Sequence, residues 1–287
     1  MSRTNDRLNV AGVIGCPVAH SLSPKLHGHW LREYGVSGAY VPLAIRKEDF
    51  SLVIQALQCA GWMGLNVTLP HKQAAFALAD ARDDAALAGR AANLLVFRDD
   101  GRIDACNTDV YGFRASVTEA LGLDALFGSA ALVLGAGGAA RAIVLALDQL
   151  GITTIQLLNR SHAKADALIS ELSPLIKASL QLLPASDWED AAARAAILVN
   201  ATSAGLNGEM PLGLSLEPLL PACVVCDLVY NPLETPFLKQ ARNRGHRTID
   251  GLGMLMHQAV PSFAAFFGST PSVTPALRRE LEQALER

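Results

Sequence analysis

The stretch Ala131-Leu-Val-Leu-Gly135-Ala-Gly137-Gly-Ala-Ala140 decides the fold of this chain. Its first four residues predict a buried strand, the pattern Gly135-x-Gly137-x-x-Ala140 predicts a tight turn, and the alanine-rich run behind it predicts a helix. In such a turn the missing side chains let backbone amides approach a pyrophosphate, which the amino terminus of the helix attracts. We therefore expect a dinucleotide site at Gly135, Ala136, Gly137, Gly138 and Ala139.

The residues after the next predicted strand indicate which dinucleotide binds. An NAD site usually places an acidic residue about 20 residues after the glycines, where it holds the ribose hydroxyl. This chain has Asn159-Arg160-Ser161 instead, and the planar fork of an arginine suits a 2′-phosphate, to which Lys164 adds a second charge. We therefore expect NADP rather than NAD. The alternative is that Arg160 is a solvated surface residue and that the two cofactors bind equally well.

Strand-like and helix-like segments alternate on both sides of the glycine turn, which is the order that builds parallel sheets covered by helices. Before the turn we expect strands at residues 10–15, 39–45 and 65–69, helices at 24–34 and 48–60, a hairpin at 92–106 and a helix to about 121. After it we expect strands at 154–158, 196–200, 224–229 and 247–250, and helices at 254–267 and 275–286. Ser23 and Thr274 are expected to cap two of these helices, each ahead of a proline. The fold class is α/β with two domains, an N-terminal α/β domain and a Rossmann doubly wound domain.

Composition excludes several classes of protein. With 287 residues, 51% of them apolar and 18% charged, the chain is globular and long enough for two cores. A net charge of -3 without a run of lysines or arginines argues against nucleic acid and against an anionic membrane surface as partners, so a small-molecule substrate is favoured. The polar amino terminus and the lack of a long apolar run predict a cytoplasmic protein. A monomer or a homodimer is expected.

Neither the cysteines nor the histidines predict a metal site. Five cysteines without an export signal argue against a disulfide framework. Cys223-Val-Val-Cys226 has metal-ligand spacing, but it lies in an apolar run without a second pair, so we expect two packed thiols. The spacing of four early histidines fits no common metal site: His20, His27, His29 and His71.

Short polar motifs follow one another along the rest of the chain. They are Ser21-Leu-Ser23-Pro24, Asn66-Val-Thr68-Leu-Pro70-His-Lys72, Asn93, Asn107-Thr-Asp109, Asn200-Ala-Thr202-Ser203, Tyr230-Asn-Pro232 and Gly251-Leu-Gly-Met254. Together with the glycine turn and Asn159-Arg160, this series resembles the shikimate dehydrogenase family from about Val13 to Phe267. The resemblance implies a substrate-binding and catalytic domain at 1–110 plus 252–287 and an NADP-binding Rossmann domain at 111–251. It also implies the interconversion of 3-dehydroshikimate and shikimate.

The resemblance assigns roles to individual side chains. Ser21 and Ser23 would bind the substrate carboxylate, while Lys72, Asn93, Asp109 and Gln258 would contact ring hydroxyls, with Thr68 and Tyr230 nearby. Lys72 would be the general acid/base and Asp109 would orient it, because oxidising an alcohol removes a proton from oxygen as hydride leaves carbon. Further cofactor contacts would come from Thr202, Ser203, Gly251 and Met254.

Two departures from the family pattern leave the substrate open. Gly28 stands where the family commonly has asparagine, and Leu94 stands where it commonly has a threonine close to the substrate. Losing one hydrogen bond to a substrate hydroxyl can change discrimination by orders of magnitude. The alternative substrates are therefore quinate, an aminoshikimate or another cyclic hydroxy acid. A non-catalytic dinucleotide or metabolite sensor is a second alternative, which the presence of both Lys72 and Asp109 disfavours.

Overall fold

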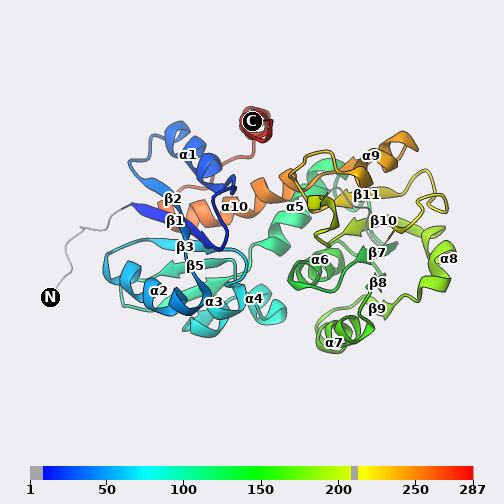
Figure 1. Ribbon diagram of the computed structural model, residues 1–287, viewed down its shortest axis with the longest axis horizontal. Coiled ribbons are helices and arrows are strands. Elements are labelled where there is room, and N and C mark those ends of the chain that lie inside the picture. Colours follow the sequence, from blue (N-terminus) through cyan, green and yellow to red (C-terminus); the bar gives the residue numbers. More distant parts are fainter. Residues whose placement is uncertain (1–8, 208–212, 287) are drawn as a thin grey trace. The chain divides into compact units, whose positions relative to one another are not determined.

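The computed structural model describes residues 9–207 and 213–286, which form two compact units (Figure 1). The first unit contains the residues up to Thr108 and those from Gln258 onward, and the second runs from Asp109 to His257. The second boundary falls inside one continuous helix, α10 (Gly251–Phe267). The first eight residues, on which the cytoplasmic prediction partly depends, lie outside the described part of the chain. None of the helices in that part has the length and apolar character needed to cross a membrane.

The first unit is built on a six-stranded mixed sheet in the order β2-β1-β3-β5-β6-β4. β1 is parallel to β2 and β3, whereas β5 is antiparallel to both β3 and β6. The antiparallel pair of β5 and β6 is the expected hairpin. The edge strand β4 was absent from the prediction and pairs parallel with β6. The strands are β1 (Val10–Gly15), β2 (Ala39–Ala44), β3 (Gly64–Val67), β4 (Ala81–Arg82), β5 (Leu94–Phe97) and β6 (Ile103–Cys106).

The helices of the first unit test the two predicted caps. The hydroxyl of Thr274 accepts a hydrogen bond from the backbone N–H of Leu277 (3.2 Å), so that cap is confirmed. The prediction that Ser23 caps the first helix is wrong, because Leu22 occupies the cap position and the N–H of Ser23 donates to Ser21 Oγ (3.3 Å). The helices are α1 (Ser23–Glu33), α2 (Phe50–Cys59), α3 (Lys72–Leu78), α4 (Asp84–Gly89), the carboxyl-terminal part of α10, α11 (Pro275–Leu285) and a 3-10 turn at Lys47–Asp49.

The second unit has a six-stranded sheet in the order β12-β11-β10-β7-β8-β9, in which all paired strands are parallel. Read from β9, this is the Rossmann order that the glycine turn predicts, and the fold-class prediction is confirmed. The edge strand β9 was not predicted, since it is short and only partly buried. The strands are β7 (Ala130–Leu134), β8 (Thr154–Leu158), β9 (Ser179–Leu182), β10 (Ala195–Asn200), β11 (Val224–Asp227) and β12 (Thr248–Ile249). The helices are α5 (Asp109–Leu121), α6 (Gly138–Gln149), α7 (His162–Leu172), α8 (Trp188–Ala192), α9 (Pro236–Asn243) and 3-10 turns at Ser173–Leu175, Ala185–Asp187 and Ala204–Asn207.

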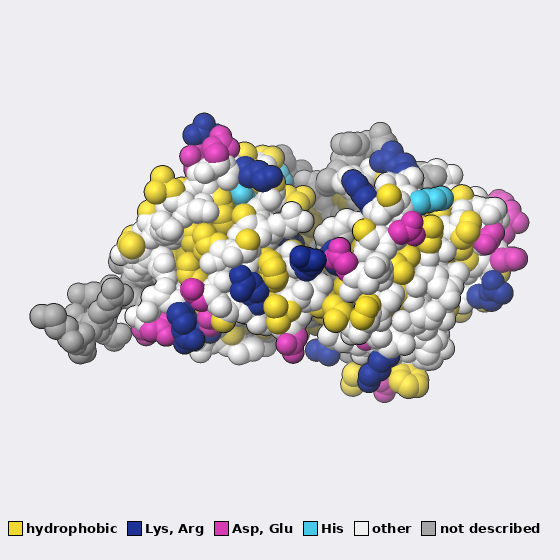
Figure 2. Space-filling view, turned by 90° about the horizontal axis from the view of Figure 1, so that it is seen from below, with side chains coloured by type: hydrophobic (Ala, Val, Ile, Leu, Met, Phe, Trp, Pro, Cys, Tyr) yellow, Lys and Arg dark blue, Asp and Glu magenta, His cyan; other side chains and the backbone are white. Residues whose placement is uncertain are grey.

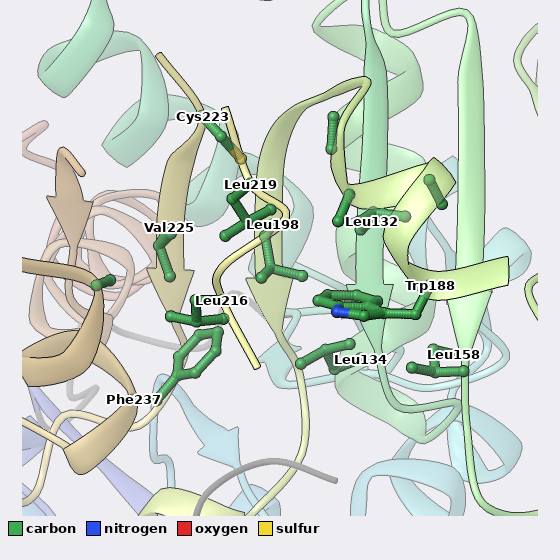
Figure 3. Close-up of a cluster of buried hydrophobic side chains, with 14 of the residues drawn as sticks. Leu132, Leu134, Leu158, Trp188, Leu198, Leu216, Leu219, Cys223, Val225 and Phe237 are labelled. Carbon is green, nitrogen blue, oxygen red and sulfur yellow. The ribbon is translucent and has the colours of Figure 1, made fainter. Parts of the chain in front are cut away.

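One core of the second unit packs around Trp188, which lies among leucines of the central strands in Figure 3. Its indole N–H donates to the carbonyl of Ser215 (3.0 Å), so the buried ring keeps its hydrogen bond. Cys223 and Cys226 are each 1% exposed, and burial raises the pKa of the Cys223 thiol to about 12. The prediction of two packed thiols is confirmed.

Charged side chains are scattered over the surface drawn in Figure 2. On this face basic and acidic side chains are interspersed.

Candidate active site

The motif from Asn66 to Lys72 forms the end of β3, a turn and the start of α3. Backbone hydrogen bonds hold the turn: the N–H of Thr68 donates to the carbonyl of Ile14 in β1 (2.9 Å), and the N–H of His71 donates to the carbonyl of Thr68 (3.0 Å). His71 is fully buried, and its Nε2 lies 2.8 Å from the carbonyl of Ile45. The half-buried Lys72, at the first position of α3, therefore extends from a fixed backbone.

Backbone contacts bring Lys72 and Asn93 together in the first unit. The carbonyl of Lys72 accepts a hydrogen bond from the N–H of Ala92 (2.9 Å), the residue before Asn93. The carbonyl of Asn93 in turn accepts bonds from the N–H of Val67 (2.8 Å) and from the side-chain amide of Asn66 (3.1 Å). Lys72 and Asn93, 21 positions apart in sequence, are thus held on neighbouring segments, one after the end of β3 and one before the start of the adjacent strand β5.

The side-chain amide of Asn93 is oriented by Thr108 and Gln258. Its Oδ1 accepts the N–H of Thr108 (2.8 Å), and its Nδ2 donates to Thr108 Oγ1 (3.0 Å) and, more weakly, to Gln258 Oε1 (3.4 Å). The hydroxyl of Thr108 also lies 3.3 Å from Gln258 Oε1. The structure therefore brings together Asn93 and Gln258, two of the predicted substrate-binding residues. Thr108 was missed, although it stands inside the Asn107-Thr-Asp109 motif.

A second set of buried hydrogen bonds is joined to this cluster through Asn66, whose side-chain amide donates to the carbonyl of Asn93. Tyr40 donates its hydroxyl to Asn66 Oδ1 (2.7 Å), and Asn66 Nδ2 lies 2.7 Å from the hydroxyl of Ser262 on α10. Burial raises the pKa of the Tyr40 hydroxyl, so Tyr40 stays a neutral donor. The sequence predicted no role for Asn66, although it belongs to the motif that ends at Lys72. Neither Tyr40 nor Ser262 stands in a pattern that would have indicated its role. Their contribution depends on tertiary contacts alone.

Ser21 and Ser23 lie at the amino terminus of α1. Ser21 is half-buried and Ser23 is 7% exposed. Because Ser21 Oγ accepts the N–H of Ser23, its own O–H remains available to donate to an anion. Helix amino termini attract negative charge, so this corner suits a carboxylate.

Asp109 and Tyr230 belong to the second unit and are described within it. Asp109 is half-buried at the first position of α5, directly after Thr108. Burial raises the pKa of the Tyr230 hydroxyl, which therefore stays protonated and can donate a hydrogen bond at neutral pH. The pairing of Asp109 with Lys72 stays a prediction.

The glycine turn in the second unit has the geometry of a phosphate cradle. Gly135 has a φ of +109°, and a Cβ there would lie 3.0 Å from the Cγ2 of Thr202, so glycine is required. Gly137 is the cap residue of α6, and the helix begins at Gly138. Both glycines are exposed, with open space where a side chain would stand. Ala140, in contrast, is fully buried and lets the helix approach the sheet.

The segment after β8 supplies the cations of the proposed cofactor site. Asn159 bonds the turn through its side-chain amide, which donates to the carbonyl of Ser161 (2.7 Å). Arg160 and Lys164 are exposed, and Lys164 lies in the first turn of α7. An exposed guanidinium beside a helix amino terminus fits a phosphate group.

The remaining predicted cofactor residues lie on two other segments of the second unit. Thr202 donates to Asn200 Oδ1 through both its N–H (3.1 Å) and its hydroxyl (2.7 Å), while Ser203 is exposed. Gly251 starts α10 and packs so closely on the carbonyl of Leu228 that a Cβ would collide with it. Met254 follows one turn later and is half-buried. In the described ranges, no group of three or more His, Cys, Asp or Glu residues could hold a metal ion.

Comparison with known proteins identifies the family. Residues 13–95 match the family described as "Shikimate dehydrogenase substrate binding domain", and residues 119–207 match "Shikimate / quinate 5-dehydrogenase". A shikimate dehydrogenase (NADP(+)) of Acidiphilium cryptum is 50% identical over 270 residues, which are 94% of this chain and 94% of that protein. The chain belongs to the shikimate dehydrogenase family. The family predicted from the polar motifs is confirmed.

Solved structures of the shikimate dehydrogenase family share both units. Shikimate 5-dehydrogenase of Thermus thermophilus, solved with NADP(H) and shikimate, is 34% identical with a TM-score of 0.82 over 96% of this chain and 98% of that one. Quinate dehydrogenase of Corynebacterium glutamicum, solved with NAD, is 30% identical with a TM-score of 0.86 over 99% of this chain and 100% of that one. Family membership therefore includes proteins with different substrates and different dinucleotides.

Proposed function

We propose that this chain is an NADP-dependent oxidoreductase that interconverts 3-dehydroshikimate and shikimate. The observation that carries the proposal is the Asn93 cluster of the first unit. It holds an oriented amide beside the backbone of Lys72, in a chain 50% identical to a shikimate dehydrogenase (NADP(+)). Directed donors and acceptors of this kind suit a small molecule with several hydroxyl groups.

The second unit fits NADP on the observations of its own structure. Gly135, Gly137 and Gly138 leave the backbone amides accessible at the start of α6, and Arg160 and Lys164 are exposed cations after β8. We assign the pyrophosphate to the glycine turn and the 2′-phosphate to Arg160. Bound NADP supplies the carbon that accepts or returns the hydride. The preference over NAD follows from Arg160 in place of the acidic residue of an NAD site.

The proton of the reaction is assigned to Lys72, with Asp109 as the carboxylate of the acid/base pair. Removal of a proton from the substrate hydroxyl must accompany the loss of hydride from its carbon, and the reverse reaction must return that proton. An amine on the rigid start of α3 suits this task, because general acid/base catalysis requires a group that is held in position.

The remaining substrate contacts are assigned mostly to residues of the first unit. Ser21 and Ser23 are assigned to the carboxylate of the acid, and Asn93 and Gln258 are assigned to ring hydroxyls. Tyr230 in the second unit and Thr68 are assigned to the border of the substrate site.

Leu94 supports a second candidate, a paralogue that acts on quinate, an aminoshikimate or another cyclic hydroxy acid. Leu94 is 2% exposed and directly follows Asn93, so an apolar side chain replaces a hydroxyl next to the substrate cluster. The deciding experiment is to follow NADPH formation with shikimate, quinate and related cyclic acids in parallel. Preference for shikimate supports the main proposal, and preference for another acid supports the paralogue. Binding of acid and NADP without turnover would support the sensor.

A cytoplasmic location and a monomeric or homodimeric state remain predictions, as does the absence of nucleic acid and membrane partners. Gel filtration with light scattering tests the oligomeric state directly.

A further inference from the structure

The carboxylate of Asp227 is a buried charge for which the proposed reaction has no use. Asp227 ends β11 and is 1% exposed. Three donors surround it: the amide of Asn200 (2.8 Å), the N–H of Val229 (3.1 Å) and the hydroxyl of Thr235 (2.7 Å). Burial raises its pKa while these bonds favour the ionised form. A buried carboxylate is costly unless such donors satisfy it, so the arrangement calls for an explanation.

Each donor belongs to a different segment of the second unit. Asn200 ends β10 and is the register partner of Asp227. Val229 directly precedes Tyr230 in the loop after β11. Thr235 caps α9 by accepting the N–H of Leu238 (3.2 Å). One carboxylate therefore joins a strand end, a loop and a helix start.

Asn200 links Asp227 to the glycine turn through Thr202. Its Oδ1 accepts the N–H and the hydroxyl of Thr202, and the same hydroxyl accepts the N–H of Ala204 (3.2 Å). The methyl carbon of Thr202 lies 3.0 Å from the position that a Cβ of Gly135 would take. A continuous series of contacts thus runs from Asp227 through Asn200 and Thr202 to the turn assigned to the pyrophosphate.

The location of this series favours a binding role over a purely structural one. In open parallel sheets, ligands bind outside the carboxyl ends of the strands, and Asn200 and Asp227 are the last residues of β10 and β11. A buried ionic group is also weak as a stabilising device, because an apolar residue of similar volume often serves the fold equally well. A carboxylate that orients two loops toward a ligand accounts for both facts.

We propose that Asp227 is a positioning residue of the dinucleotide site: it holds Asn200, and through it Thr202, in the arrangement that binds NADP. The inference rests on the proposed function, because it assigns the glycine turn and Thr202 to that cofactor.

The test measures NADP binding to the full-length protein by calorimetry, with the Michaelis constant for the cyclic acid measured separately at saturating NADP. Asp227→Asn keeps the shape but turns one acceptor into a donor, and Asn200→Ala and Thr235→Val remove two of the donors. Each variant is expected to raise the Kd for NADP about tenfold or more, the effect of losing a hydrogen bond to a charged group. The Michaelis constant for the acid should change less than about twofold. The loss of NADP affinity in the double variant Asp227→Asn/Asn200→Ala should be smaller than the sum of the two single losses, because both residues belong to one hydrogen-bonded series.

The matched control is Thr274→Val, which removes the same kind of helix cap from α11 in the first unit. It should lower the melting temperature and leave the Kd for NADP unchanged. Unchanged NADP affinity in folded Asp227→Asn or Thr235→Val protein would overturn the inference, as would an equal loss of affinity in Thr274→Val. Wild-type protein that does not bind NADP would overturn the proposed function and the inference with it. Wild-type binding with unaffected variants would overturn the inference alone.

Discussion

The two proposed binding regions are made of different kinds of group. In the first unit the polar atoms belong to buried side chains, with Asn66, Asn93 and Thr108 between 4% and 6% exposed. In the second unit they belong to an exposed backbone turn at Gly137 and Gly138 and to the exposed cation of Arg160. A small polyol is distinguished by the direction of each hydrogen bond, whereas a dinucleotide is held largely by its phosphates. Substitutions in the two units should therefore have separable kinetic effects.

Burial shifts the pKa values of a histidine in the first unit and an aspartate in the second in opposite directions. His27 in the first unit is fully buried and stacks on Tyr40 with 3.9 Å between ring centroids, and burial lowers its pKa to about 3. Asp227 in the second unit has its pKa raised by burial. Burial favours the neutral form of both groups, but at Asp227 the hydrogen bonds from Thr235, Val229 and Asn200 oppose it by favouring the carboxylate. Falling pH is therefore expected to destabilise the fold through His27, whose pKa is lowered, and not through Asp227, whose pKa is raised.

The largest expected effect separates chemistry from binding. Lys72→Ala should lower kcat by about 10²–10⁴-fold, the usual share of general acid/base catalysis, with the Kd for NADP unchanged. Steady-state assays and NADP calorimetry measure the two quantities. Lys25→Ala, which removes an exposed lysine of α1, is the control and should retain normal turnover. Near-normal kcat in Lys72→Ala would remove this residue from the mechanism.

The next effect distinguishes the two units by their Michaelis constants. Asn93→Ala should raise the constant for the cyclic acid about 10–100-fold, because it removes an oriented amide and leaves the backbone N–H of Thr108 without that acceptor. The constant for NADP should stay the same. Asn159→Ala is the matched variant of the second unit and should affect NADP alone. The comparison fails if either variant changes both constants equally.

A smaller effect concerns cofactor choice. Arg160→Ala should lower the ratio of catalytic efficiencies with NADP and NAD about tenfold, since a guanidinium contact with the 2′-phosphate is lost. Efficiency with NAD should change little. Arg194→Ala removes another exposed arginine of the second unit and serves as control. An unchanged ratio of the two catalytic efficiencies in Arg160→Ala would show that Arg160 does not bind the 2′-phosphate.

The smallest expected effect is on stability and depends on pH. In the unfolded chain His27 is protonated below its ordinary pKa of 6.5, whereas in the folded chain burial lowers this pKa to about 3. Folding stability from this residue is therefore lost as the pH falls through that window. Between about pH 6 and pH 5 the loss amounts to about 1 kcal/mol.

His27→Phe should remove this part of the pH dependence. Among the described residues neither ring nitrogen of His27 has a hydrogen-bond partner, so phenylalanine loses no such bond and keeps the stacking on Tyr40. Melting temperatures of wild type and variant should therefore diverge as the pH falls, with the variant higher. His20→Gln, at an exposed position, should follow wild type. Parallel curves for wild type and His27→Phe would contradict the assignment.

Local signals in the sequence were sufficient where a motif and its structure are contiguous. The strand, glycine turn and helix from Ala130 to Gln149 were predicted because their geometry depends on neighbouring residues alone. The cap by Thr274 was predicted for the same reason. The cap by Ser23 was wrong because the helix begins at Ser23 itself with Leu22 at the cap position, and the hydroxyl that accepts the N–H of Ser23 belongs to Ser21.

Long-range partners could not be predicted in this way. The amide of Asn93 is oriented by Gln258, which lies 165 positions away, and Asn66 meets Ser262 across 196 positions. No local pattern distinguishes Ser262 from other polar residues of a helix. The edge strands β4 and β9 were missed for a related reason, since two to four partly buried residues carry little periodicity.

The sequence by itself determined the family, the α/β class, the dinucleotide turn and the residue types available for the reaction. These properties depend on short segments in which turn chemistry, helix starts and apolar periodicity act locally. Only the tertiary structure decided which polar groups are buried together, as in the chain Tyr40–Asn66–Ser262 and the contacts of Asp227. Hydrogen bonds between distant segments form only when the sheets assemble, and burial then makes each of them matter, because water is no longer present to replace a lost partner.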